Sequence, residues 1–151
     1  KGYHALRMWG PESATLIRHA QQVRLLKLVP SSGSEEENHL INNKIRIGED
    51  DFTIVQARDI STIRGLVHAR HTLIVDRSFD WDRNVTSAPA EWDFALEFSD
   101  QDQQVTLVFA LQQRIVHNLK TGQQQAMNET LERIAEYLKP QLAAMTTSST
   151  D

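Results

Sequence analysis

Hydrophobic and polar residues alternate most clearly in the segment that begins at Trp92. Residues 92, 94, 96 and 98 are large and apolar, whereas 93, 95, 97 and 99 would point the other way. A period of two is typical of a strand with one buried face. The polar run 100–104 reads as a turn, and two further apolar runs follow it, at 105–111 and 114–119. The pattern predicts three consecutive antiparallel strands, each with one apolar and one solvated face.

The pattern before residue 60 predicts a helix and three more strands. Residues 1–10 form an aromatic lead-in, and Pro11 and Ser13 provide a helix start. A strand over 23–29 is ended by Pro30, and the run 31–38 has no apolar residue, which indicates a solvated loop. One further strand is predicted around Ile41, Ile45 and Ile47. Another is predicted at residues 52–56, where the chain returns from a turn.

Two further helices are predicted from apolar residues at helical spacing. Asp59 or Ser61 would cap the first, whose inward stripe is Ile63, Leu66, Val67, Arg70, Leu73 and Ile74. Gly65 inside this helix costs about 1 kcal/mol relative to alanine, and a close helix-to-sheet contact would explain it. The last helix begins near Gln124, and Pro140 kinks or ends it.

Together these elements predict one α+β domain over residues 1–145, followed by a disordered tail at 146–151. The domain would hold an antiparallel sheet of about six strands and about three helices. Two arrangements remain open. The chain could consist of two helix-plus-meander halves, or of a single sheet with its helices on one face.

Composition narrows the class of protein. A chain of 151 residues can bury a core without disulfides or metal. Its net charge is −4 and its basic residues are scattered, which argues against nucleic-acid binding. An apolar stretch of about 18 residues, as needed to span a membrane, does not occur. The absence of cysteine excludes thiol catalysis, disulfides and thiolate metal sites.

Two patterns suggest metal sites. His68 and His71 lie three residues apart, so on a helix they share a face, and Asp76 could complete a zinc site with them. The alternative is a pair of surface histidines. The second pattern begins at Asp80 and resembles a calcium loop, with oxygen-bearing residues at Asp80, Asp82, Asn84, Thr86 and Glu91. Val85 at the sixth position, where glycine is needed, argues for an ordinary connecting loop.

Phe79 and Trp81 lie among aspartates in the predicted loop 76–91. Exposed aromatic side chains beside Asp80 and Asp82 could contact a partner protein or line a small-molecule cleft. The alternative is that the aromatic rings fold back over the edge of the core.

The run from Trp92 to Leu111, together with Gly2-Tyr3, resembles a class of small exported bacterial proteins of unknown function. Those proteins often carry cysteines in the strand that corresponds to residues 108–111, which has none here. The resemblance implies an α+β fold and export to the periplasm or cell surface. The first residue, Lys1, also suggests a processed chain whose signal or anchor was removed; a cytoplasmic protein is the alternative.

The sequence contains no Gly-x-Ser-x-Gly, no His-Glu-x-x-His and no glycine-rich phosphate loop. We therefore expect a non-enzymatic interaction or ligand-binding domain of an exported bacterial protein. The alternative is a metal-dependent enzyme that uses His68, His71 and Asp76. A third possibility is a homo-oligomer formed by pairing of sheet edges.

Overall fold

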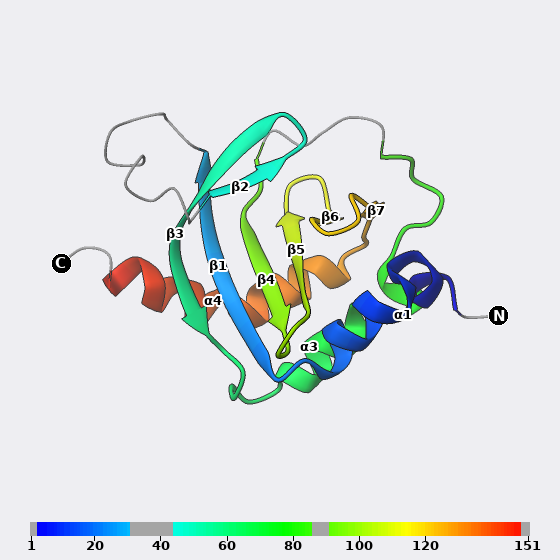
Figure 1. The fold of residues 1–151 in the computed structure, drawn as a ribbon. Helices are drawn as coiled ribbons and strands as arrows, with labels where there is room; N and C mark the ends of the chain where they lie inside the picture. The colour runs from blue at the N-terminus through cyan, green and yellow to red at the C-terminus, as the bar shows by residue number, and fades with distance from the viewer. Residues whose placement is uncertain (1–2, 31–43, 86–90, 149–151) are drawn as a thin grey trace.

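The computed structural model describes residues 3–30, 44–85 and 91–148 and shows an α+β fold (Figure 1). Within these ranges there are three α-helices, one 3₁₀ helix and seven strands, one strand more than expected. In chain order they are α1 (His4–His19), β1 (Gln22–Pro30), β2 (Lys44–Ile47), β3 (Asp50–Asp59), α3 (Leu66–Thr72), the 3₁₀ helix η2 (Asp76–Ser78), β4 (Phe94–Ser99), β5 (Gln104–Ala110), β6 (Ile115–Asn118), β7 (Gln124–Ala126) and α4 (Thr130–Ser148).

All seven strands belong to one antiparallel sheet with the order β2-β3-β1-β4-β5-β6-β7. Strand β1 joins the two predicted halves, since Leu25 pairs with Arg58 of β3 on one side and with Leu96 of β4 on the other. The chain therefore forms a single sheet instead of two separate meanders. Its edge strands are β2 and β7, and pairing of these edges with a second copy stays a prediction.

The helices gather on one face of the sheet, where the larger hydrophobic core lies (Figure 1). This core takes residues from α1, α3, α4 and the sheet. Its largest fully buried side chains include Phe94, Phe98 and Phe109. Phe94 and Phe109 are cross-strand partners whose rings stack with centroids 5.0 Å apart. The aromatic alternation that begins β4 thus builds the layer on which the helices pack.

The opposite face of the sheet is not solvated as the alternation predicted. Ala95 of β4 and Val108 of β5 are fully buried there with Leu26 and with residues of β2 and β3. The sheet curls so that β2 and β3 fold over this face (Figure 1), and a β-bulge between Lys27 and Leu28 interrupts the β1–β3 register. The predicted common face of Trp92 and Phe94 is also wrong, because Trp92 packs in this second core.

The remaining part of this second face carries a polar cluster. Arg24 Nε and Nη2 donate to the two carboxylate oxygens of Glu97 at 2.7 and 3.1 Å, and Gln104 Nε2 donates to the same carboxylate at 3.1 Å. The hydrogen bonds to Glu97 raise the pKa of Arg24. Glu97 and its cross-strand partner Thr106 are largely buried, whereas the Arg24 side chain stays 38% exposed.

Helix α1 begins at His4, so the predicted lead-in at residues 1–10 is mostly helical. Pro11 does begin a second helical segment, because Gly10 interrupts the first one with φ 82° and ψ 161°. Glycine takes this left-handed φ without steric conflict, and proline suits the first position of a helix. The result is a kinked helix in place of the single short helix that the sequence predicted.

Helix α3 is shorter than predicted, and its turn at Gly65 explains the glycine. Gly65 has a φ of 86° directly before the helix, where a residue with a side chain would be strained. A Cβ at this position would also lie 3.2 Å from Cε1 of Tyr137 in α4. The close approach is therefore to a helix, and the predicted contact with the sheet is wrong. Val67 is 68% exposed and does not belong to the inward stripe.

Helix α4 begins at Thr130 because residues 124–126 pair with β6 as strand β7, where the sequence predicted the first turn of the helix. It continues through Pro140 to Ser148, beyond the predicted start of the tail at residue 146. Residues 149–151 of that predicted tail lie outside the described part of the chain, as do the predicted loop 31–38 and the residue Ile41. Among the described helices, α4 included, there is none long and apolar enough to cross a membrane.

Candidate functional site

The segment that contains α3 and η2 holds helix α1 at both of its ends. At the start of α1, the carboxylate of Asp76 accepts hydrogen bonds from the backbone N–H groups of His4 and Ala5 at 3.1 and 2.7 Å. The first N–H groups of a helix have no partner within it, and a negative charge there also complements the helix dipole. Asp76 therefore caps α1 from 71 residues away in sequence.

At the other end of α1, Arg70 supplies the opposite charge. Its Nε donates to the carbonyl oxygen of Ile17 at 2.7 Å, and its Nη2 donates to those of Leu16 and Ala20 at 3.1 and 3.0 Å. The guanidinium also lies 5.5 Å from the ring centroid of Phe98. Burial lowers the pKa of Arg70. The final carbonyl groups of α1 thus meet a fixed cation, which favours the helix dipole.

Replacing the Asp76 carboxylate with a neutral group should make the free energy of unfolding less sensitive to a fall in pH. The backbone N–H of Ala5, with that of His4, holds the pKa of Asp76 below its ordinary value of 3.8. A group whose pKa is lower in the folded state stabilises the protein above its unfolded pKa, and this contribution disappears as the pH falls through the folded pKa. We expect Asp76→Asn to lower the free energy of unfolding at neutral pH and to match wild type in strong acid.

Urea unfolding at several pH values between neutral and strongly acidic measures this difference. Asp82→Asn is the matched control, because the exposed Asp82 carboxylate accepts no hydrogen bond from the described residues. A stability gap for Asp76→Asn that is the same at every pH would contradict the capping role of the charged carboxylate.

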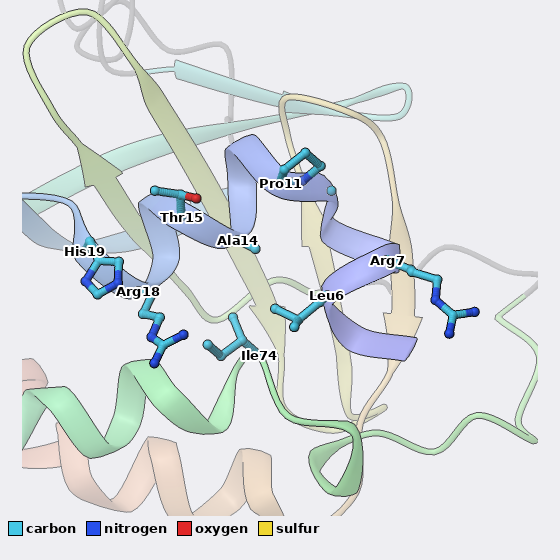
Figure 2. A pocket seen from close by; sticks show the side chains of 9 residues that line it. Leu6, Arg7, Pro11, Ala14, Thr15, Arg18, His19 and Ile74 are labelled. Carbon is cyan, nitrogen blue, oxygen red and sulfur yellow. The ribbon is translucent and has the colours of Figure 1, made fainter. Parts of the chain in front are cut away.

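A groove of about 560 Å³ runs along α1, between this helix and Ile74 (Figure 2). Leu6, Ala14 and Ile74 point toward one another across it and form its apolar floor. Leu6 comes from the helical segment before the Gly10 kink and Ala14 from the segment after it, and both line the groove. Because Ile74 lies between Arg70 and Asp76 in the chain, the segment that anchors α1 also provides the opposite wall of the groove.

Basic side chains line both ends of the groove. Arg7 is near the start of α1, and Arg18 and His19 are at its end. None of the described residues that line the groove is acidic. Among the residues that the structure describes, the side chains of Arg7 and Arg18 make no ion pair or hydrogen bond. Other cations do form ion pairs, namely Arg24–Glu97, Arg83–Asp80, Arg114–Glu132 and Lys120–Glu12. The groove thus combines an apolar floor with unpaired positive charge.

The three predicted zinc ligands do not form a common site. His68 and His71 lie on α3 and are exposed, while both oxygens of Asp76 face the start of α1. Over residues 3–30, 44–85 and 91–148, no group of three or more histidine, aspartate or glutamate side chains is placed to hold a metal ion. Zinc binding by these three residues stays a prediction, and the described residues do not assemble a set of ligands for it.

The aromatic residues of the loop after η2 fold back onto the start of α1. Phe79 is buried, and the ring of Trp81 lies 5.2 Å from Phe79 and 5.6 Å from His4 between centroids. Trp81 Nε1 donates to the backbone oxygen of Asp76 at 3.0 Å. This is the arrangement expected of rings that cover the edge of the core. Trp81 keeps 38% of its surface exposed, so partner contact through it stays a prediction.

The acidic residues of this loop make local contacts. Asp80 lies 3.6 Å from Arg83 as an ion pair, and its Oδ1 accepts a hydrogen bond from the backbone N–H of Asp82 at 3.3 Å. Thr86, which the calcium pattern requires at its seventh position, lies outside the described residues. Calcium binding and ligand contact by Asp80 and Asp82 therefore stay predictions.

The sequence pattern did not identify the groove. Residues 1–10 were expected to lead into a helix that starts at Pro11, so Leu6 and Arg7 were not assigned to a helix face. The four-residue spacing of Leu6, Gly10 and Ala14 does not place them on one face, because Gly10 interrupts the helix. No sequence signal places Ile74 opposite this face, because that contact depends on how the segment after α3 returns to α1.

No family model, curated protein or solved structure matches the chain. The geometry of the groove and its charges are therefore the features that bear on function.

Proposed function

We propose that this protein is a non-enzymatic binding domain that holds a small anionic amphiphile in the groove along α1. The ligand would have an apolar body and one acidic group. The observation that carries the proposal is the apolar floor beside Arg18, which is unpaired among the described residues of a protein with net charge −4. Export from the cytoplasm, expected from the sequence, is part of the same proposal.

The size and lining of the groove suit the apolar body. Its volume of about 560 Å³ lies within the range of roughly 300–1,000 Å³ that is common for small-molecule sites. A ligand seated there would cover Leu6, Pro11 and Ile74. Removal of apolar surface from water contributes roughly 25 cal/mol per Å², so an apolar body of moderate size supplies much of the binding energy.

The acidic group would bind at the Arg18 end. Arg18 extends toward α3 beside Ile74, and His19 adjoins it, whereas Arg7 extends away from Ile74 (Figure 2). A guanidinium can donate two parallel hydrogen bonds to a carboxylate or sulfonate, which fixes the direction of a ligand as well as its affinity. This arrangement would place the apolar body between Ala14 and Leu6.

Fluorescence titration with 8-anilinonaphthalene-1-sulfonate tests the proposal, because this probe joins an apolar body to one sulfonate. We expect saturable binding to the folded protein and a dissociation constant about tenfold higher for Arg18→Gln, since a charge-assisted hydrogen bond contributes on the order of 1.4 kcal/mol. Ala14→Glu, which places bulk and negative charge on the floor, should remove the binding.

Two controls make the result specific. Arg46→Gln removes an exposed arginine from β2, at the edge of the sheet, and should leave the dissociation constant unchanged. Decanoate should displace the probe, while decyltrimethylammonium, with a similar apolar tail but a positive head, should not. If Arg18→Gln and Arg46→Gln weaken binding equally, or both amphiphiles displace the probe, the proposal is wrong.

A further inference from the structure

A second cavity, of about 280 Å³, lies on the other side of α3, where η2 and α4 border it. Three basic side chains line it, and each comes from a different element: His68 from α3, Arg77 from η2 and Arg133 from α4. Arg77 and Arg133 are far apart in sequence, so only the tertiary fold brings them to one cavity.

The basic side chains of this cavity are unpaired among the residues that the structure describes. No acidic side chain is among the described residues that line it. Glu132, the immediate neighbour of Arg133, accepts a hydrogen bond from Arg114 at 2.8 Å instead. The side chains of His68, Arg77 and Arg133 make no hydrogen bond or ion pair with any residue in the described ranges. Their donors are therefore available to a bound anion.

The rest of the cavity supplies a polar group and an apolar wall. Ser78 lines it and is only 1% exposed, so its side chain is the polar group of the wall. Ile134 and the ring of Tyr137 provide the apolar wall, and the Tyr137 hydroxyl is already bonded to the carbonyl oxygen of Arg64. Burial raises the pKa of Tyr137, so it remains a neutral donor.

We propose that this cavity binds the phosphate group of a small phosphorylated molecule. Two guanidinium groups and an imidazole offer more donors than a single carboxylate accepts, whereas a phosphate presents three terminal oxygens and up to two charges. Helix α4 begins at Thr130 in the lining, so the positive end of its dipole adds to the same attraction. The organic part of the ligand would pack on Tyr137 and Ile134.

Calorimetric titration with inorganic phosphate, phenyl phosphate and benzoate tests this site. We expect phenyl phosphate to bind more tightly than phosphate, because its ring covers the apolar wall, and more tightly than benzoate, because it has more acceptor oxygens. Arg77→Gln and Arg133→Gln should each raise the dissociation constant of phenyl phosphate about tenfold. Both arginines are exposed, and circular dichroism would verify that the variants fold.

Two variants separate this site from the groove along α1. Arg18→Gln should weaken the sulfonate probe but leave phenyl phosphate binding unchanged, and Arg133→Gln should do the reverse. Arg46→Gln should change neither. The phosphate site is refuted if phenyl phosphate does not bind, if Arg46→Gln weakens it as much as Arg133→Gln, or if benzoate binds as tightly.

Discussion

Replacing Arg70 with methionine is expected to lower the free energy of unfolding by about 2–4 kcal/mol, because several charge-assisted hydrogen bonds are lost together. Methionine replaces the apolar stem of the arginine but cannot donate to the carbonyl oxygens of Leu16, Ile17 and Ala20. The Leu16 oxygen still accepts the N–H of Ala20, whereas the described residues supply no other donor to the Ile17 oxygen. Urea unfolding measures the change.

Two further variants show whether the several donors of the guanidinium, and not only its charge, stabilise the end of α1. Arg70→Lys keeps the charge at the end of α1 but cannot reach three carbonyl groups, so we expect an intermediate loss. Arg64→Met is the matched control, because Arg64 is exposed and its guanidinium has no partner among the described residues. Equal stabilities of Arg70→Met and Arg64→Met would show that Arg70 does not anchor α1.

Phe109→Ala is expected to lower the free energy of unfolding by about 3–5 kcal/mol, the range for removing a fully buried aromatic side chain. Phe109 is 0% exposed and lies in the core beneath the helices. Its ring stacks on Phe94 at 5.0 Å, and Val116 is its partner on β6. Truncation would leave a cavity that rigid neighbouring strands cannot fill by small movements.

Thermal and urea unfolding of Phe109→Ala should be compared with Phe109→Leu and Tyr3→Ala. Leucine keeps much of the buried volume, so the loss should be smaller than for alanine. Tyr3 is 58% exposed, and its truncation should change stability by less than about 1 kcal/mol. A similar loss for Tyr3→Ala and Phe109→Ala would mean that Phe109 is not part of a tightly packed core.

The anchoring of α1 connects stability with the proposed binding. Arg70 and Asp76 fix the two ends of α1, and Trp9 Nε1 donates to the carbonyl oxygen of Leu73 at 2.7 Å near its middle. The segment from Arg70 to Asp76 includes Ile74, which faces α1 across the groove (Figure 2). One short segment therefore holds both walls of the groove at a fixed separation.

The α+β class and most of the strands could be predicted from the sequence. The alternation after Trp92 located β4, and the apolar runs at 105–111 and 114–119 located β5 and β6, because strand periodicity is a local property. The pattern failed where local signals were weak. Gln124–Ala126 has no strand pattern and becomes β7 only because β6 lies beside it. Export and the identity of any ligand stay predictions.

The candidate sites, in contrast, were decided by tertiary structure. Asp76 was considered as a candidate metal ligand, and its carboxylate caps α1 because the fold brings unpaired N–H groups to it. Arg70 was assigned to an apolar stripe and meets the other end of the same helix. Spacing along the chain determines which residues share a face, but a groove needs a second wall. Only the return of the chain after α3 places Ile74 opposite α1 and brings Arg77 and Arg133 to one cavity.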